Sequence, residues 1–190
     1  MKVCAVNNIS FRAKLINKSD LGKLIEGCYP SCYERQSASF VEIDSSNTDD
    51  IKALSEVAKY WMYGKFTSNI YHAACALRNG SNYYKNHKIY ALTTQKSNYN
   101  NLNSDKILGL VHVSPNNDNY TFIEHFEVNP QYIYASEQEY KGIGTAMLDS
   151  LKQVYNKLSC CPLSSKYVIN FYEKNGFIKE PEKFNYYIYS

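Results

Sequence analysis

A pair of glycines at the start of an amphipathic run is the first feature of the sequence that could support chemistry. The glycines are Gly142 and Gly144, and helically spaced apolar residues follow them. Glycine allows backbone N–H groups to approach a phosphate closely, and the helix dipole favours negative charge at that end. The pattern therefore marks a candidate anion site, whose backbone donors would be Lys141, Gly142, Ile143, Gly144 and Thr145.

This glycine pair is a weak signal when taken alone, because ordinary loops also place glycine before a helix. It lacks the G-x-x-x-x-G-K-[ST] spacing of a nucleotide-binding loop and the G-x-G-x-x-G of a dinucleotide fold. A second feature follows near the C-terminus, where the chain runs Asn170-Phe171-Tyr172-Glu173-Lys174-Asn175-Gly176-Phe177. Together and in this order, the two features exclude more functions than either feature does alone.

Composition excludes several other classes of protein. With 190 residues, 44% of them hydrophobic, the chain is expected to form one globular domain. A net charge of +3 with scattered lysines argues against nucleic-acid binding. We expect a cytoplasmic protein that does not bind membranes, because no targeting segment or membrane-length apolar stretch is evident. The six cysteines match neither a disulfide framework nor a zinc site, so reduced thiols and no bound metal are expected.

Periodicity and turn signals predict the elements that must position these residues. Residues 1–37 give mixed signals, including a possible short helix at 21–26, and are expected to form an N-terminal arm. The domain is expected at 38–190, in a mixed α/β (α+β) class with a mostly antiparallel central sheet flanked by helices. Its expected strands are 39–43, 88–93, 106–114, 119–128, 176–179 and 184–189, and its helices are 48–61, 68–77, from the glycine pair to about 157, and 165–174.

These features resemble the GCN5-related N-acetyltransferase (GNAT) superfamily. The matching segments are Val128-Asn129-Pro130, the turn from Glu139 to Gly144, and the segment from Phe171 to Phe177. The resemblance is specific over about residues 120–178 and topological over 39–190. It implies that the glycine turn binds acetyl-coenzyme A (acetyl-CoA) as a co-substrate. Glu139 stands where the family prefers Gln or Arg, and Ser165 stands where many members carry Asn.

The resemblance also implies roles for single residues. Tyr172 matches the tyrosine that protonates the departing coenzyme A thiolate, and Val128 matches the position whose backbone amide polarises the thioester carbonyl. Glu124 lies four residues before Val128, where some members place a catalytic His or a carboxylate that holds water. Glu124 is therefore a candidate base or substrate contact, and a solvated or paired strand carboxylate is the alternative. His112 and His125 are expected to be structural or exposed.

The expected function is transfer of an acetyl group from acetyl-CoA to a primary amine, by direct attack in a ternary complex. The alternative is a catalytically silent GNAT-fold protein that binds acyl-CoA or serves as an interaction module. A third reading is transfer of an acyl group other than acetyl. The acceptor could be a small molecule or a protein, and neither its identity nor the oligomeric state follows from the sequence.

Overall fold

The computed structural model describes residues 13–27, 31–61, 66–116, 118–134 and 138–190. Their strands form one nine-stranded sheet in the order β6-β1-β2-β3-β4-β5-β7-β9-β8. The strands are β1 (Lys14–Leu24), β2 (Tyr33–Glu42), β3 (Lys88–Thr93), β4 (Ile107–Pro115), β5 (Thr121–Val128), β6 (Tyr140–Lys141), β7 (Leu158–Cys160), β8 (Ile178–Lys179) and β9 (Tyr187–Tyr189). Within the described part of the chain, every ladder is antiparallel except that between β5 and β7. The predicted mixed, mostly antiparallel sheet is therefore confirmed.

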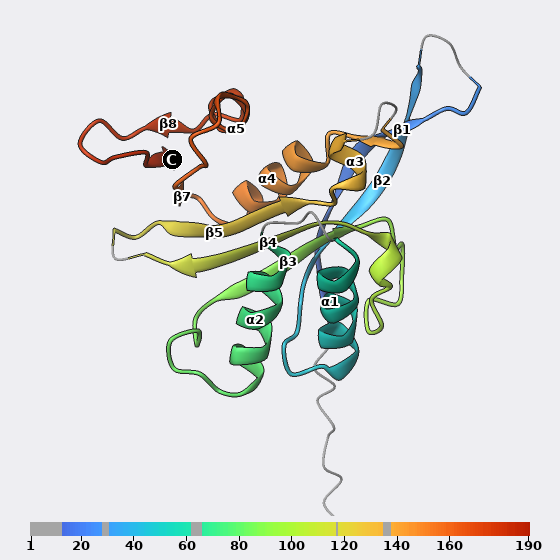
Figure 1. The fold of residues 1–190 in the computed structure, drawn as a ribbon, viewed down its shortest axis with the longest axis horizontal. Coiled ribbons are helices and arrows are strands. Elements are labelled where there is room, and N and C mark those ends of the chain that lie inside the picture. The colour runs from blue at the N-terminus through green and yellow to red at the C-terminus, as the bar shows by residue number, and fades with distance from the viewer. Residues whose placement is uncertain (1–12, 28–30, 62–65, 117, 135–137) are drawn as a thin grey trace, which may run out of the picture.

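Helices cover both faces of this sheet (Figure 1). They are α1 (Thr48–Tyr60), α2 (Thr67–Arg78), α3 (Gln131–Tyr134), α4 (Ile143–Val154) and α5 (Lys166–Lys174), and a 3-10 turn spans Ser104–Lys106. In Figure 1, α1 and α2 lie together on one face, and α4 lies on the other. None of the described helices is long and apolar enough to cross a membrane.

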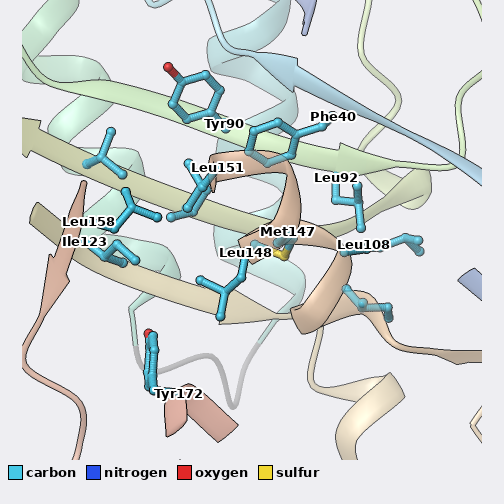
Figure 2. Close-up of a cluster of buried hydrophobic side chains, with 14 of the residues drawn as sticks. Phe40, Tyr90, Leu92, Leu108, Ile123, Met147, Leu148, Leu151, Leu158 and Tyr172 are labelled. Carbon is cyan, nitrogen blue, oxygen red and sulfur yellow. The ribbon is translucent and has the colours of Figure 1, made fainter. Parts of the chain in front are cut away.

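Two hydrophobic clusters fill the spaces between the sheet and its helices. Figure 2 shows the cluster under α4, where Met147, Leu148 and Leu151 face apolar side chains of the sheet. Gly109 on β4 permits this close packing, because a Cβ there would lie 2.2 Å from the Met147 sulfur. Burial of these apolar side chains on the sheet therefore fixes the position of α4, and with it the glycine turn at its start.

The expectation for the N-terminal segment needs correction. Residues 21–26 do not form a helix, because residues up to Leu24 belong to β1, which pairs along its length with β2. The expected boundary at residue 37 falls inside β2. Residues 1–12 and 28–30 of the expected arm lie outside the described residues. Much of β1 is exposed or half-buried, so the alternation that reveals a strand is weak there.

The remaining elements agree with the prediction except in detail. β3 has the expected bounds, and α1, α2, β4, β5 and α5 begin and end within two residues of expectation. α4 ends at Val154, three residues early, and the chain then forms β7. The short elements α3 and β6 were not predicted. The two C-terminal strands, β8 and β9, are present but shorter than predicted.

Among the described cysteines, one departs from expectation. Cys32 is disulfide-bonded, so the prediction of reduced thiols throughout the chain is wrong. Cys75, Cys160 and Cys161 are free thiols. In the described part of the chain, no group of three or more His, Cys, Asp or Glu side chains could hold a metal ion.

Candidate functional site

A cleft opens where β5 and β7 separate. The two strands pair from Thr121 and Leu158 to Ile123 and Cys160, and among the described residues their ladder stops there. The cleft has a volume of about 540 Å³. Its walls come from β5, from the chain after β7, from α5 and from the start of α4, and include Glu124, Phe126, Val128, Cys161, Pro162 and Tyr172. Residues distant in sequence therefore meet at this break in the sheet.

The edge of β5 presents backbone groups to the cleft. The Asn129 N–H donates to the Leu108 carbonyl across the β4–β5 ladder at 2.9 Å. In an antiparallel ladder, successive N–H groups point to opposite sides of the strand. The Val128 N–H therefore points away from β4, towards the side on which β7 has diverged. This orientation makes the Val128 amide a donor on the cleft side of the strand.

A β-bulge at Glu124 sets which β5 side chains enter the cleft. His112 pairs with His125, whereas Val113 pairs with Ile123, so Glu124 is the extra residue of the ladder. The Ser114 hydroxyl donates to the Glu124 carboxylate at 2.6 Å. Glu124 is thus a half-buried carboxylate held in place at the cleft.

Glu127 has a different position and partner. Its carboxylate accepts from the Phe66 N–H at 3.0 Å and from the Thr67 hydroxyl at 2.5 Å. These donors lie at the N-terminus of α2, where the dipole favours negative charge. Glu127 therefore caps α2 from β5 and lies outside the lining of the cleft.

The glycine turn begins α4 at the mouth of the cleft. Gly142 has φ of +82°, the left-handed conformation that favours glycine, and it supplies no capping side chain. The first helical hydrogen bond runs from the Ala146 N–H to the Gly142 carbonyl, at 2.9 Å. The N–H groups of Ile143, Gly144 and Thr145 precede that bond, so the helix itself provides no acceptor for them. These three residues line the cleft and could hold an anion there.

Gly144 also packs closely against α5. A Cβ at this position would lie 3.0 Å from the Phe171 ring. Phe171 belongs to α5, so the close approach of α4 and α5 depends on the missing side chain. The second glycine of the pair therefore links the turn to the helix that carries Tyr172.

Lys141 lies on the other side of the turn. Its ammonium is 3.9 Å from the centre of the Tyr33 ring, a cation–π contact with β2. It lines an adjoining hollow of about 480 Å³ with Lys18, Gly142 and Thr145. Of the candidate site residues, Lys141 is thus the one that the structure places outside the cleft lining.

Tyr172 projects from α5 and is 6% exposed. Its ring packs edge-on against Phe177, with the ring centres 5.2 Å apart, and against Phe126 at 6.3 Å. In Figure 2 its hydroxyl points away from α5, towards Ile123 and Leu158. Burial, and secondarily the Cys160 thiol, raises the pKa of Tyr172 above its ordinary value. The phenol therefore remains protonated.

Several lining residues were not singled out from the sequence. Tyr132 and Tyr140 line the cleft and pack edge to face, with their ring centres 5.4 Å apart. Phe66, Cys161 and His125 line it as well. Phe66 follows residues outside the described part of the chain, and Cys161 follows a three-residue strand, so neither had a motif. A larger cavity of about 690 Å³, between α1 and residues 94–106, contains none of the predicted site residues.

Comparison with known proteins identifies the family of the chain. The family model described as Acetyltransferase (GNAT) family matches residues 77–177, more than half of the chain. The comparison with curated proteins gave no match. A solved structure assigned to the GNAT family, from Desulfovibrio desulfuricans, is 12% identical over 80% of this chain and 96% of its own, with a TM-score of 0.54. GNAT-family acetyltransferases from Staphylococcus aureus and Bacillus cereus are each 14% identical over 80% of this chain, with TM-scores of 0.48, and cover 98% and 94% of their own chains. The chain belongs to the GNAT acetyltransferase family.

Proposed function

We propose that this protein transfers an acetyl group from acetyl-CoA to a primary amine, by direct attack in a ternary complex. The observation that carries the proposal is the convergence of three features on one cleft. These features are the N–H groups at the start of α4, the edge of β5 beyond its ladder with β7 and the Tyr172 side chain.

Acetyl-CoA fits the groups that converge there. Its pyrophosphate would accept from the N–H groups of Ile143, Gly144 and Thr145, which have no acceptor within α4. Lys141 would add positive charge from the adjoining hollow. Its thioester would lie along β5, with the carbonyl oxygen accepting from the Val128 N–H.

Glu124 is proposed as the base of the cleft. In the reaction the amine nitrogen attacks the thioester carbon, the carbon–sulfur bond breaks, and the nitrogen must lose a proton. The Ser114 hydroxyl holds the Glu124 carboxylate in place. A fixed carboxylate can orient the ammonium form of the acceptor by charge and then accept its proton.

Tyr172 is proposed to stabilise the departing thiolate. Because burial raises the pKa of the phenol, hydrogen-bond donation to sulfur is favoured over formation of a tyrosinate. The proton passes to sulfur only to the extent that the thiolate is more basic than the buried phenol. Tyr172 therefore contributes as a positioned donor inside a cleft shielded by aromatic rings.

Calorimetric titration with acetyl-CoA tests the first step, with Gly144→Val as the control. We expect micromolar binding to the wild type and no measurable binding to the variant, since the added side chain would meet Phe171 and displace the turn. Circular dichroism on both proteins separates lost binding from lost folding. Absence of binding to the wild type would contradict the proposal.

A thiol-release assay with a panel of amines then tests the transfer itself. Release of coenzyme A that depends on one class of amine would support the N-acetyltransferase. Binding of acetyl-CoA without release for any amine would favour the catalytically silent protein. Faster release of coenzyme A from a longer acyl-CoA would indicate that the protein transfers that acyl group rather than acetyl.

A further inference from the structure

Three imidazoles form a continuous hydrogen-bonded line beside the cleft. His125 Nδ1 lies 3.2 Å from His112 Nδ1, and His112 Nε2 lies 2.9 Å from His87 Nδ1. The residues come from β5, from β4 and from the residue before β3. The rings of His112 and His125 are stacked, with their centres 5.5 Å apart. The line thus crosses two neighbouring strands of the sheet.

The two ends of this line reach different cavities. His125 lines the cleft, beside Glu124. His87 lines a separate cavity of about 470 Å³, together with Glu42, Asp44, Lys85 and Lys88. His112, between them, is 2% exposed. A proton that moved along the three rings would therefore pass from the cleft to the second cavity.

The hydrogen bonds between the three rings require that their tautomers change together. Burial lowers the pKa of His112 to about 3, so this ring is neutral and has one donor and one acceptor nitrogen. If the Asn69 amide donates to His125 Nε2, at 3.2 Å, His125 must donate from Nδ1 and His112 from Nε2. The opposite set of tautomers makes the two ring–ring bonds in the reverse direction and leaves His125 Nε2 protonated, so the Asn69 amide no longer donates to it. The line therefore has two matched states, which differ by the passage of one proton.

We propose that His125, His112 and His87 conduct the proton that the acceptor amine loses from the cleft to the cavity at His87. This inference rests on the proposed function. It adds a route by which Glu124 loses the proton it has accepted, so that the carboxylate is ready for the next turnover. Bound substrates would occupy the cleft, so a route behind its wall lets the proton leave while they are in place.

The proton balance of the step is simple. The proton taken up by Glu124 passes to His125 Nε2, and Asn69, which is exposed, gives up its contact there. His125 then loses its Nδ1 proton to His112, His112 loses its Nε2 proton to His87, and His87 releases its Nε2 proton to solvent. After the products leave, the cleft is open to water, and the line returns to its first state by proton exchange at both ends.

Substitution at the outer end tests the proposal, because His87 lies beside a cavity. We expect His87→Ala to lower kcat about 10- to 100-fold with little change in KM. Imidazole in solution should restore kcat, since it can enter the cavity and accept from His112. His87→Gln should be equally slow, because glutamine can accept the hydrogen bond but cannot pass a proton. His72→Ala is the matched control, since His72 is exposed on α2.

Nitrogen NMR of the histidine rings provides a readout that does not depend on activity. We expect all three rings to be neutral and to show one of the two matched sets of tautomers. Tautomers that vary independently would overturn the line itself. An unchanged kcat in His87→Ala, or a loss that imidazole does not restore, would overturn its role in transport. A wild type that transfers to no amine would overturn the proposed function, and the transport role with it, while the tautomers would still show whether the line exists.

Discussion

The backbone N–H of Leu24 donates to the carbonyl oxygen of Glu139 at 2.8 Å. This bond joins the end of β1 to the residue before β6, and the ladder continues through Lys23 with Tyr140 and Gly22 with Lys141. The next residue, Gly142, begins the turn into α4. The N-terminal hairpin, formed by β1 and β2, therefore holds residues 139–141 in the sheet. These residues lead directly into the glycine turn.

Side chains of β1 hold the helix that follows the turn. The Ser19 and Ser150 hydroxyls are 2.9 Å apart, and the Asn17 side-chain amide donates to the Ser150 carbonyl at 3.3 Å. Ser150 lies in the middle of α4. The hairpin thus contacts the chain on both sides of the turn, which restricts the freedom of the loop before any ligand binds.

Leu24→Pro should weaken acetyl-CoA binding about tenfold, because it removes one hydrogen bond, worth about 0.5–1.5 kcal/mol, beside the turn. Calorimetric titration measures the effect. Leu24→Ala is the control, since it keeps the backbone N–H and should bind as the wild type does. Equal dissociation constants for the proline and alanine variants would contradict a role for the hairpin in holding the turn.

Gly142 and Gly80 form a matched pair for testing the turn. Both have positive φ, +82° and +72°, and at neither would an added Cβ meet another atom within 4 Å. Alanine at either position should cost about 1–2 kcal/mol of unfolding free energy, from backbone strain alone. Denaturant titration should give similar losses for the two variants. Only Gly142→Ala should also raise the dissociation constant for acetyl-CoA, and a similar rise in Gly80→Ala would point to a general effect of stability.

Tyr172→Phe should lower kcat about 10²-fold and leave acetyl-CoA binding unchanged, because it removes the donor to the thiolate but keeps the packed ring. Steady-state coenzyme A release measures kcat, and titration measures binding. Tyr60→Phe is the control, because its side chain is 67% exposed at the end of α1 and lies outside the cleft lining. Full activity in Tyr172→Phe would remove the phenol from the mechanism.

The buried carboxyl group of Asp50 should make the free energy of unfolding depend on pH. Its side chain is fully buried and accepts from the Asp44 N–H at 3.0 Å. Burial raises the pKa of Asp50 to about 7, from 3.8. Between these two values the folded protein keeps a proton that the unfolded chain has lost. The contribution of Asp50 to stability is therefore full below about pH 4 and is lost as the pH rises towards 7.

Asp50→Asn should remove this dependence, since the amide oxygen can still accept from Asp44 and carries no charge. We expect the variant to gain about 1–3 kcal/mol over the wild type above pH 7, with a difference that shrinks at acid pH. Thermal or denaturant unfolding across pH 4–8 measures it. Asp49→Asn, at an exposed neighbour, should show no difference that grows across this range. A constant offset for Asp50→Asn at all pH values would contradict the buried, protonated carboxyl.

Local patterns were sufficient for most of the fold and for the two motifs. Ile51, Leu54 and Val57 recur at helical spacing and are buried in α1, because one face of a surface helix must meet the core. Gly142 and Tyr172 stand in motifs that predicted their shared site, and both line the cleft. The pairing of β1 with β6 was not predictable, because a polar strand owes its place to partners distant in sequence.

The sequence by itself determined the family pattern, the order of the main elements and the candidate groups, since these depend on neighbouring residue types and short spacings. Tertiary structure alone decided which groups share the cleft. The bulge places Glu124 in the cleft. The hydrogen bond with the N-terminus of α2 holds Glu127 outside the cleft, and the cation–π contact with Tyr33 holds Lys141 outside its lining. Each outcome depends on a contact between residues of different elements, and such contacts form only when the sheet and its helices have packed.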